Sequence, residues 1–186
     1  MRRPTSRRHV LCFPRSTRVA DGPLLIGVVG WKNSGKTTLV ERLIPLLARR
    51  GLEVATVKHT HHDLRAPDGA TDGERHARAG AVKTIVIALT AWEIDGHRQA
   101  DAPPAFGDLP AYLAEADVVI VEGFKKAPIP KIEMRRRASS TQEPLAPRDS
   151  HVIAVAADNP TESSGLPVFA LDDAEGIAAF IAARAK

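Results

Sequence analysis

The chain has 186 residues, 44% hydrophobic and 26% charged, which is typical of one globular domain with a full core. Its single cysteine excludes a disulfide framework and suits a reducing cytoplasm, and no apolar run is long enough for a membrane helix. The net charge is +4, but residues 1–22 hold six arginines and one acid, so the rest of the chain carries −1. A nearly neutral body argues against a protein whose main task is binding nucleic acid.

The arginine-rich segment at residues 1–22 is predicted to be a solvated, disordered arm, followed by a single domain over residues 23–186. A basic arm that grips nucleic acid or acidic lipid is the alternative for this segment. Ser6-Arg7-Arg8 is similar to part of a twin-arginine export signal, but the CFPRSTRVADG that follows is not the apolar region such a signal needs. We therefore predict a cytoplasmic protein.

Strand and helix patterns alternate from residue 24 onward. LLIGVVG at 24–30 is short and continuously apolar, which is typical of a buried parallel strand. Residues 35–50 have helical spacing and end at Gly51, although Pro45 lies inside this helix and should kink it or cost about 3 kcal/mol. Further strands are predicted at 53–60, 83–90, 117–124, 151–158 and 167–172, a more exposed strand at 130–137, and helices at 74–81, 109–116 and 174–186.

The order of these elements predicts the fold class. Strands alternating with helices imply right-handed crossovers and a doubly wound, mainly parallel sheet. The strand at 24–30 is expected at its centre, with ligands at the carboxyl edge. AWEIDGHRQA at 91–100 turns at Asp95-Gly96 and is predicted to form a β-hairpin. The prediction is an α/β fold, a three-layer α/β/α sandwich with a β-hairpin insertion.

A phosphate-binding pattern, G-x4-G-K-T, follows the first predicted strand and opens the first predicted helix. Gly30 and Gly35 allow backbone N–H groups to turn toward an anion, and the helix N-terminus adds its dipole. Lys36 supplies charge to the β- and γ-phosphates, and the Thr37 hydroxyl is placed to ligate Mg²⁺. We predict a nucleoside-triphosphate site of a P-loop NTPase, formed by Gly30, Asn33, Ser34, Gly35, Lys36, Thr37 and Thr38.

Glu122 and Lys32 are two further candidates for roles at this site. Glu122 directly follows the apolar run 118–121, so it is the predicted carboxylate for Mg²⁺ or for positioning water. Lys32 stands one residue later than the lysine that some dimeric P-loop ATPases insert into the partner's site. We interpret Lys32 as an ordinary loop lysine, with a role in a partner's site as the alternative.

KHTHHD at residues 58–63 leaves the second predicted strand at the same edge of the sheet. In an extended chain, His59, His61 and Asp63 face one way, and Lys58 and His62 face the other. We predict phosphate-binding or switch-loop roles for these residues, with Asp63 able to hold a Mg²⁺-bound water. A transition-metal site is the alternative, but the segment offers no cysteine ligand.

Other polar residues are expected near the same edge. Asp72 lies at the start of a predicted helix and is either a site residue or a helix N-cap. Lys125, Lys131 and Arg135–Arg137 form a basic stretch that either receives an anionic second ligand or is a solvated strand face. Asp158 stands where a guanine-reading aspartate would, but the lysine that usually stacks on the base is missing, so the residues alone leave guanine and adenine open.

In this order, GWKNSGKTTLVERLIPLL, VKHTHHD, D-x-x-R-H-x-x-AGA, VEGFK, PKIE and HVIAVAAD resemble the MobB family of molybdopterin-guanine dinucleotide biosynthesis adaptor proteins. The resemblance covers about residues 24–186. It implies a homodimeric, Mg²⁺-dependent protein that binds GTP and hydrolyses it weakly. Its partners would be molybdopterin, or its guanine dinucleotide, and a MobA-type guanylyltransferase, which attaches GMP to molybdopterin.

The resemblance also implies residue roles. Gly30–Thr38 would bind the triphosphate, Thr37 and Glu122 would serve Mg²⁺, and Lys125 and Lys131 would face the rim. The lining residues would be His59, His61, His62, Asp63 and Asp72, with Lys36, Glu122 and Asp63 as the catalytic set. LIP recurs at this helix in the family, which accounts for Pro45. The chain departs from the family at Gly73, where Ser or Thr is common, and in its arginine-rich arm.

Three functions remain open on the sequence. An adaptor GTPase would hydrolyse slowly, because no arginine finger or water-positioning glutamine is evident. A small-molecule kinase would use Arg135–Arg137 as a lid over the transferred phosphate. A nucleic-acid binder would depend on residues 1–22 and on salt.

Overall fold

The fold is described by a computed structural model, which places residues 22–60, 64, 71–159, 163 and 165–185. All but the last residue of the predicted disordered arm lies outside these ranges, so its conformation stays a prediction. Within them, none of the helices is long and apolar enough to cross a membrane.

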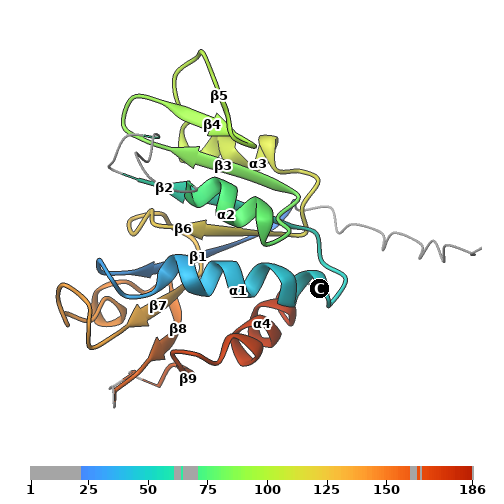
Figure 1. Ribbon diagram of the computed structural model, residues 1–186. Coiled ribbons are helices and arrows are strands. Elements are labelled where there is room, and N and C mark those ends of the chain that lie inside the picture. Colours follow the sequence, from blue (N-terminus) through green and yellow to red (C-terminus); the bar gives the residue numbers. More distant parts are fainter. Residues whose placement is uncertain (1–21, 61–63, 65–70, 160–162, 164, 186) are drawn as a thin grey trace, which may run out of the picture.

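The described strands form one nine-stranded sheet in the order β5-β4-β3-β2-β6-β1-β7-β8-β9 (Figure 1). The parallel strands are β1 (Leu24–Gly30), β2 (Val54–His59), β3 (Lys83–Ile87), β6 (Val118–Glu122), β7 (Lys131–Arg135), β8 (Val152–Ala157) and β9 (Val168–Ala170). β4 (Trp92–Ile94) and β5 (His97–Arg98) are antiparallel. The predicted hairpin is confirmed, with Asp95 (φ 50°) and Gly96 (φ 78°) at its turn.

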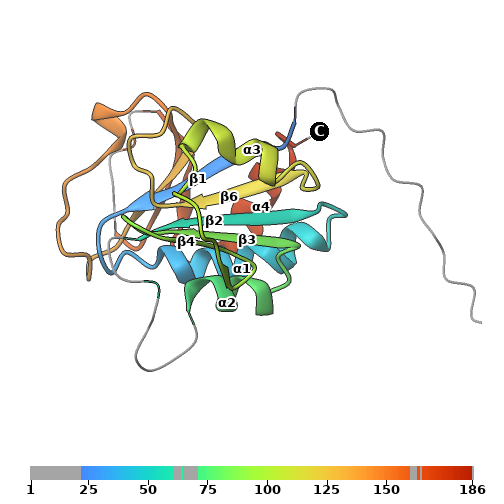
Figure 2. The same ribbon diagram turned by 90° about the horizontal axis from the view of Figure 1, so that it is seen from above.

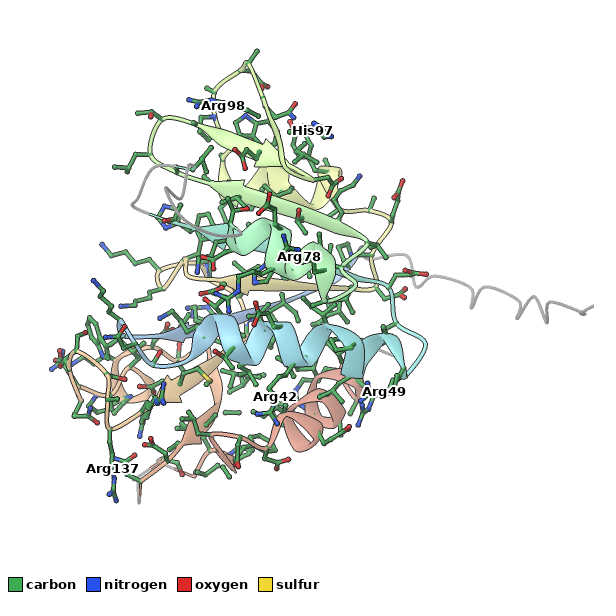
Figure 3. All side chains as sticks on the ribbon, in the orientation of Figure 1. Arg42, Arg49, Arg78, His97, Arg98 and Arg137 are labelled. Carbon is green, nitrogen blue, oxygen red and sulfur yellow. The ribbon has the colours of Figure 1, made fainter. Side chains whose placement is uncertain are left out.

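Helices cover the two faces of the sheet unequally. The α-helices are α1 (Lys36–Ala48), α2 (Asp72–Arg78), α3 (Leu109–Tyr112) and α4 (Ala174–Ala182), and the 3-10 helices are η1 (Phe106–Asp108) and η2 (Ala146–Arg148). Figure 2 shows α3 on one side of the sheet and α1 and α2 on the other. α4 packs against α1, and Arg42 points from α1 toward the segment that enters α4, where it donates to the Asp172 carbonyl at 2.7 Å (Figure 3).

The core has two parts because alternate strand residues point to opposite faces. Ile26, Val28 and Ile120 pack beneath α1 and α4, whereas Val119 and Val121 pack beneath α3. This arrangement confirms the predicted three-layer α/β/α fold with a mainly parallel sheet. It also leaves β1 between β6 and β7, so the loop after Gly30 emerges near the middle of the carboxyl edge.

Three predictions about individual elements need correction. The strand predicted to be more exposed, β7, lies between β1 and β8, and its residues 131–134 are buried. The helix predicted at 109–116 ends at Tyr112, because the chain turns there to bury Leu113 and enter β6. α2 begins two residues earlier than predicted, since Thr71 caps it and forms a capping box with Glu74. Asp72 is therefore not the N-cap.

Candidate functional site

The loop between β1 and α1 has the backbone geometry of a phosphate cradle. Gly30 (φ 154°), Asn33 (φ 67°) and Gly35 (φ 87°) all have positive φ, which curls the loop and aims N–H groups inward. The Lys36 ammonium contacts this loop: it donates a hydrogen bond to the Trp31 carbonyl at 2.8 Å and lies 3.4 Å from Ser34 Oγ. Burial lowers the pKa of Lys36, although the charge of Glu122 acts in the opposite direction.

Two pockets open beside the loop. The smaller, about 490 Å³, is lined by Asn33, Gly35, Lys36, Thr37, Thr38, Arg75, Arg136 and Ala138. The larger, about 800 Å³, shares Gly35, Thr38 and Arg136 with it and extends past Asp158 and Asn159 toward Asp172. The first has the position expected for phosphates after β1. The second lies beyond the carboxyl end of β8, where the base of a nucleotide is expected in this type of sheet.

A buried carboxylate lies below the loop. Glu122 ends β6, its side chain is 1% exposed, and its Oε1 accepts a hydrogen bond from the Thr37 hydroxyl at 2.8 Å. The Lys58 ammonium bonds the same Oε1 and lies 3.0 Å from Asp72 Oδ2. Thr37 and Glu122, the two residues predicted to serve Mg²⁺, are therefore hydrogen-bonded to each other, and Asp72 is joined to them through Lys58.

His76 approaches the same carboxylate from α2. It is buried, its Nδ1 is 3.2 Å from Thr56 Oγ1, and its Nε2 is 3.7 Å from Glu122 Oε2. Burial lowers the pKa of His76 despite the nearby negative charges of Glu122 and Asp72. Neither Nε2 nor Oε2 has a hydrogen-bond partner among the described residues, so Oε2 is the Glu122 oxygen that neither Thr37 nor Lys58 bonds.

The donor atoms fit Mg²⁺ better than a transition metal. Thr37 and Glu122 offer a hydroxyl and a carboxylate, and hard oxygen donors of this kind, completed by phosphate oxygens, are typical of nucleotide-bound Mg²⁺. No group of three or more His, Cys, Asp or Glu side chains suited to a metal ion occurs in the described part of the chain. His61, His62 and Asp63 lie outside it, so their predicted roles stay predictions.

Comparison with known proteins identifies the family. A family model described as molybdopterin guanine dinucleotide synthesis protein B matches residues 25–158. The chain belongs to the MobB family. It is 38% identical to the molybdopterin-guanine dinucleotide biosynthesis adapter protein of Haemophilus influenzae, covering 74% of this chain and 76% of that protein. The Escherichia coli protein of the same name is 33% identical over 84% of this chain and 90% of its own length. The Bacillus subtilis MobB crystal structure covers 88% of this chain and 98% of its own, with 30% identity and a TM-score of 0.57.

The residues outside the loop that the MobB resemblance assigns to the site do not all lie near it. His59 stacks on Phe124, with ring centres 4.6 Å apart, on the α3 face of the sheet and away from Glu122. The Lys125 ammonium lies 3.7 Å from the centre of the Trp31 ring, so it borders the loop, and burial lowers its pKa. Asp158 lines the larger pocket, where its Oδ1 accepts the Arg137 N–H at 2.9 Å.

The expectation that Lys131 faces the rim is wrong. Its side chain is 1% exposed, and its ammonium donates to Asp149 Oδ2 at 2.6 Å, beside the amino end of β8. The phosphate loop follows the carboxyl end of β1, so Lys131 points to the other edge of the sheet. A buried ammonium needs a charged partner, and Asp149 supplies it. We therefore leave Lys131 out of the site.

The Lys131–Asp149 pair predicts a pH dependence of stability. Burial raises the pKa of Asp149, but hydrogen bonds from Lys131 and His151 outweigh it and lower the pKa below 3.8. A lowered carboxyl pKa contributes stability above the unfolded value and loses it as the pH falls through the folded value. Asp149→Asn is expected to lower the unfolding free energy by about 1–2 kcal/mol at pH 7, because Asp149 is partly exposed. Urea titrations from pH 3 to 7 should show the difference shrinking below pH 4, and a constant difference would contradict it.

The glycine that departs from the MobB pattern has a packing reason. A Cβ on Gly73 would lie 2.8 Å from Val86 Cγ2, because the first turn of α2 rests directly on β3. Serine or threonine at this position would require Val86 to shift. The sequence comparison could only register a missing hydroxyl, whereas the structure shows a close approach of helix and strand.

Two side chains at the centre of the site were not predicted as site residues. The KHTHHD pattern places Lys58 on the face opposite His59 and does not single it out, and the sequence predicts only a helical position for His76. A signal for Lys58 exists in the strand order: it pairs in register with Glu122 on the neighbouring parallel strand, so both side chains share a face. His76 carries no comparable signal, because its contact depends on how α2 packs.

Proposed function

We propose that this chain binds GTP with Mg²⁺, hydrolyses it slowly, and acts as a cytoplasmic, homodimeric adaptor for a MobA-type guanylyltransferase that forms the molybdopterin guanine dinucleotide. The adapter name of the Haemophilus influenzae and Escherichia coli relatives supports the place in molybdenum cofactor synthesis. The loop geometry and the two connected pockets support the nucleotide.

The observation that carries the proposal is the contact of Thr37 with buried Glu122 beneath the ammonium of Lys36. In this arrangement the loop N–H groups and Lys36 bind the phosphates, while Thr37 and Glu122 hold Mg²⁺, which would neutralise the charge that develops on the phosphates. Glu122 Oε2 has room for a second task, because it lacks a hydrogen-bond partner among the described residues. It can accept a hydrogen bond from a water that is to attack.

The arginines near the phosphates explain why hydrolysis should be slow. Arg75 lines the smaller pocket but is held by both carboxylate oxygens of Glu41, one of them 3.0 Å from Nη2. Arg136 lines both pockets. Arg135 pairs instead with Glu133 at 2.8 Å, so the triplet does not act as one unit. Of Arg135–Arg137, Arg136 is the one that lines these pockets, which suits nucleotide binding and gives little support to the lid that a kinase needs.

Support for guanine comes from Asp158, together with the guanine dinucleotide named in the relatives' descriptions. Asp158 Oδ1 accepts the Arg137 N–H, which orients the carboxylate at the mouth of the larger pocket. A carboxylate can accept two N–H groups of guanine, whereas adenine lacks that pair of donors.

Calorimetric titration of the wild type with GTP and with ATP, both with Mg²⁺, tests the proposal. GTP is expected to bind at least tenfold more tightly, a difference of about 1.4 kcal/mol. Asp158→Asn keeps an oxygen for the Arg137 N–H and should remove most of that preference. Equal affinity for the two nucleotides would contradict the guanine assignment. Repeating the GTP titration with the MobA-type enzyme present should show a ternary complex, and fast phosphate transfer to a small acceptor would favour the kinase.

A further inference from the structure

The ammonium of Lys58 lies at the centre of the carboxylate cluster. It bonds Glu122 Oε1, lies 3.0 Å from Asp72 Oδ2, and lies 3.4 Å from Thr37 Oγ1. These oxygens come from β6, α2 and α1, so three separate elements converge on one charged group. Two of them belong to Thr37 and Glu122, the residues assigned above to Mg²⁺.

Strand pairing and burial fix Lys58 in this place. Lys58 pairs in register with Glu122 across β2 and β6, and its side chain is 13% exposed against 1% for Glu122. A buried carboxylate without a compensating charge would be strongly destabilising. Lys58 supplies that charge, and the Thr37 hydroxyl supplies a hydrogen bond to the same oxygen.

We propose that Lys58 is a resident counter-cation, which holds Glu122 in place and must leave it before the carboxylate can serve a metal ion. The inference rests on the proposed Mg²⁺–nucleotide function of the same site. The Lys58 ammonium and a divalent cation cannot share Glu122 Oε1 and Thr37 Oγ1, because two like charges a few ångströms apart repel strongly. Asp72 is one-third exposed at the edge of the cluster and can keep its ion pair with Lys58 after the exchange.

The exchange would make metal binding depend on nucleotide. Without nucleotide, Lys58 already neutralises Glu122, so the site should bind a divalent cation weakly. The phosphates of a nucleotide add negative charge, which offsets the repulsion between a metal on Glu122 and the Lys58 ammonium that remains paired with Asp72. Lys58 would thus select for the metal–nucleotide complex over the metal alone, a role that an ion pair serving only stability would not have.

Titration with Mn²⁺ alone, followed by the electron paramagnetic resonance of free Mn²⁺ and without any nucleotide, tests this role. Lys58→Met is expected to bind one Mn²⁺ at least tenfold more tightly than the wild type. Lys126→Met removes a lysine that is exposed on the loop after β6, and it should behave as the wild type. A Lys58→Met affinity no higher than that of the wild type would overturn the proposal.

Lys58→Gln keeps an amide donor for Glu122. If Lys58→Met does not fold, the Mn²⁺ affinity of Lys58→Gln is compared with that of the wild type instead. Adding Glu122→Gln to Lys58→Gln should abolish the gain in Mn²⁺ affinity, and a gain that survives would overturn the proposal because the metal would then lie elsewhere. Thermal unfolding gives a second readout: Mn²⁺ should raise the Tm of the Lys58 variants more than that of the wild type. A wild type that binds no GTP would refute the proposed function but would leave this comparison readable.

Discussion

Lys36→Ala is expected to weaken the binding of GTP with Mg²⁺ at least 100-fold, which is about 2.8 kcal/mol. The Lys36 ammonium is oriented over the loop by the Trp31 carbonyl, 2.8 Å away, and by Ser34 Oγ. It is partly desolvated, as its lowered pKa indicates, so its attraction for the β- and γ-phosphates is screened less than that of a surface lysine. Calorimetric titration of the wild type and the variant measures the loss.

Lys32→Ala is the matched control for this prediction. It removes a lysine from the same loop, but the Lys32 side chain is exposed, and the loop contact at this residue is made by its carbonyl, which accepts the Ser140 N–H at 3.0 Å. GTP affinity should change less than threefold in Lys32→Ala. An equal loss in both variants would mean that the total charge of the loop, and not the place of Lys36, determines affinity. A loss that depends on protein concentration would support the alternative in which Lys32 enters a partner's site.

The sequence predicted the positions of the loop, between a strand and a helix, and of Glu122, at the end of a buried strand, because both signals are local. The loop needs glycines at fixed spacing between a strand and a helix, all within Leu24–Ala48. Glu122 needs only an apolar run before it. Each of these signals follows from the backbone conformation and from the alternation of side chains along a strand. The fold class followed for the same reason, since the order of strands and helices restricts the sheet to a few topologies.

The sequence did not predict which charged side chains are buried, where each is neutralised by a residue distant in the chain. PKIEMRRR at 130–137 predicts a more exposed strand, which corresponds to β7. The structure buries Lys131 on Asp149 and uses Glu133 to accept the N–H groups of Leu145 and Ala146, at 2.7 and 2.9 Å. These partners lie in the connection to β8, and no local pattern marks them. Lys58 was missed for a related reason, because its role appears only when β2 and β6 are placed side by side.

Gly30→Ala is expected to lower the unfolding free energy by about 3 kcal/mol and to remove measurable GTP binding. A Cβ on Gly30 would lie 2.6 Å from Ser34 Oγ and 2.7 Å from the Met134 carbonyl, at a φ of 154°. Met134 pairs in register with Gly30 across β1 and β7, so its carbonyl cannot retreat without disturbing a central strand pair. The loop must shift instead, which moves Ser34 and with it the N–H groups that face the phosphates.

Gly51→Ala separates this contact effect from the general cost of replacing a glycine. Gly51 also has a positive φ, 82°, but a Cβ there would meet no heavy atom within 4 Å. Gly51→Ala should therefore lower the unfolding free energy by about 1 kcal/mol, through the strained backbone conformation alone. Its GTP affinity should not change. Urea titrations and calorimetry on the two variants give the comparison. The prediction would be contradicted by a Gly30→Ala protein that is no less stable than Gly51→Ala and still binds GTP. The close packing of Gly30 against Met134 would then not determine the shape of the phosphate-binding loop.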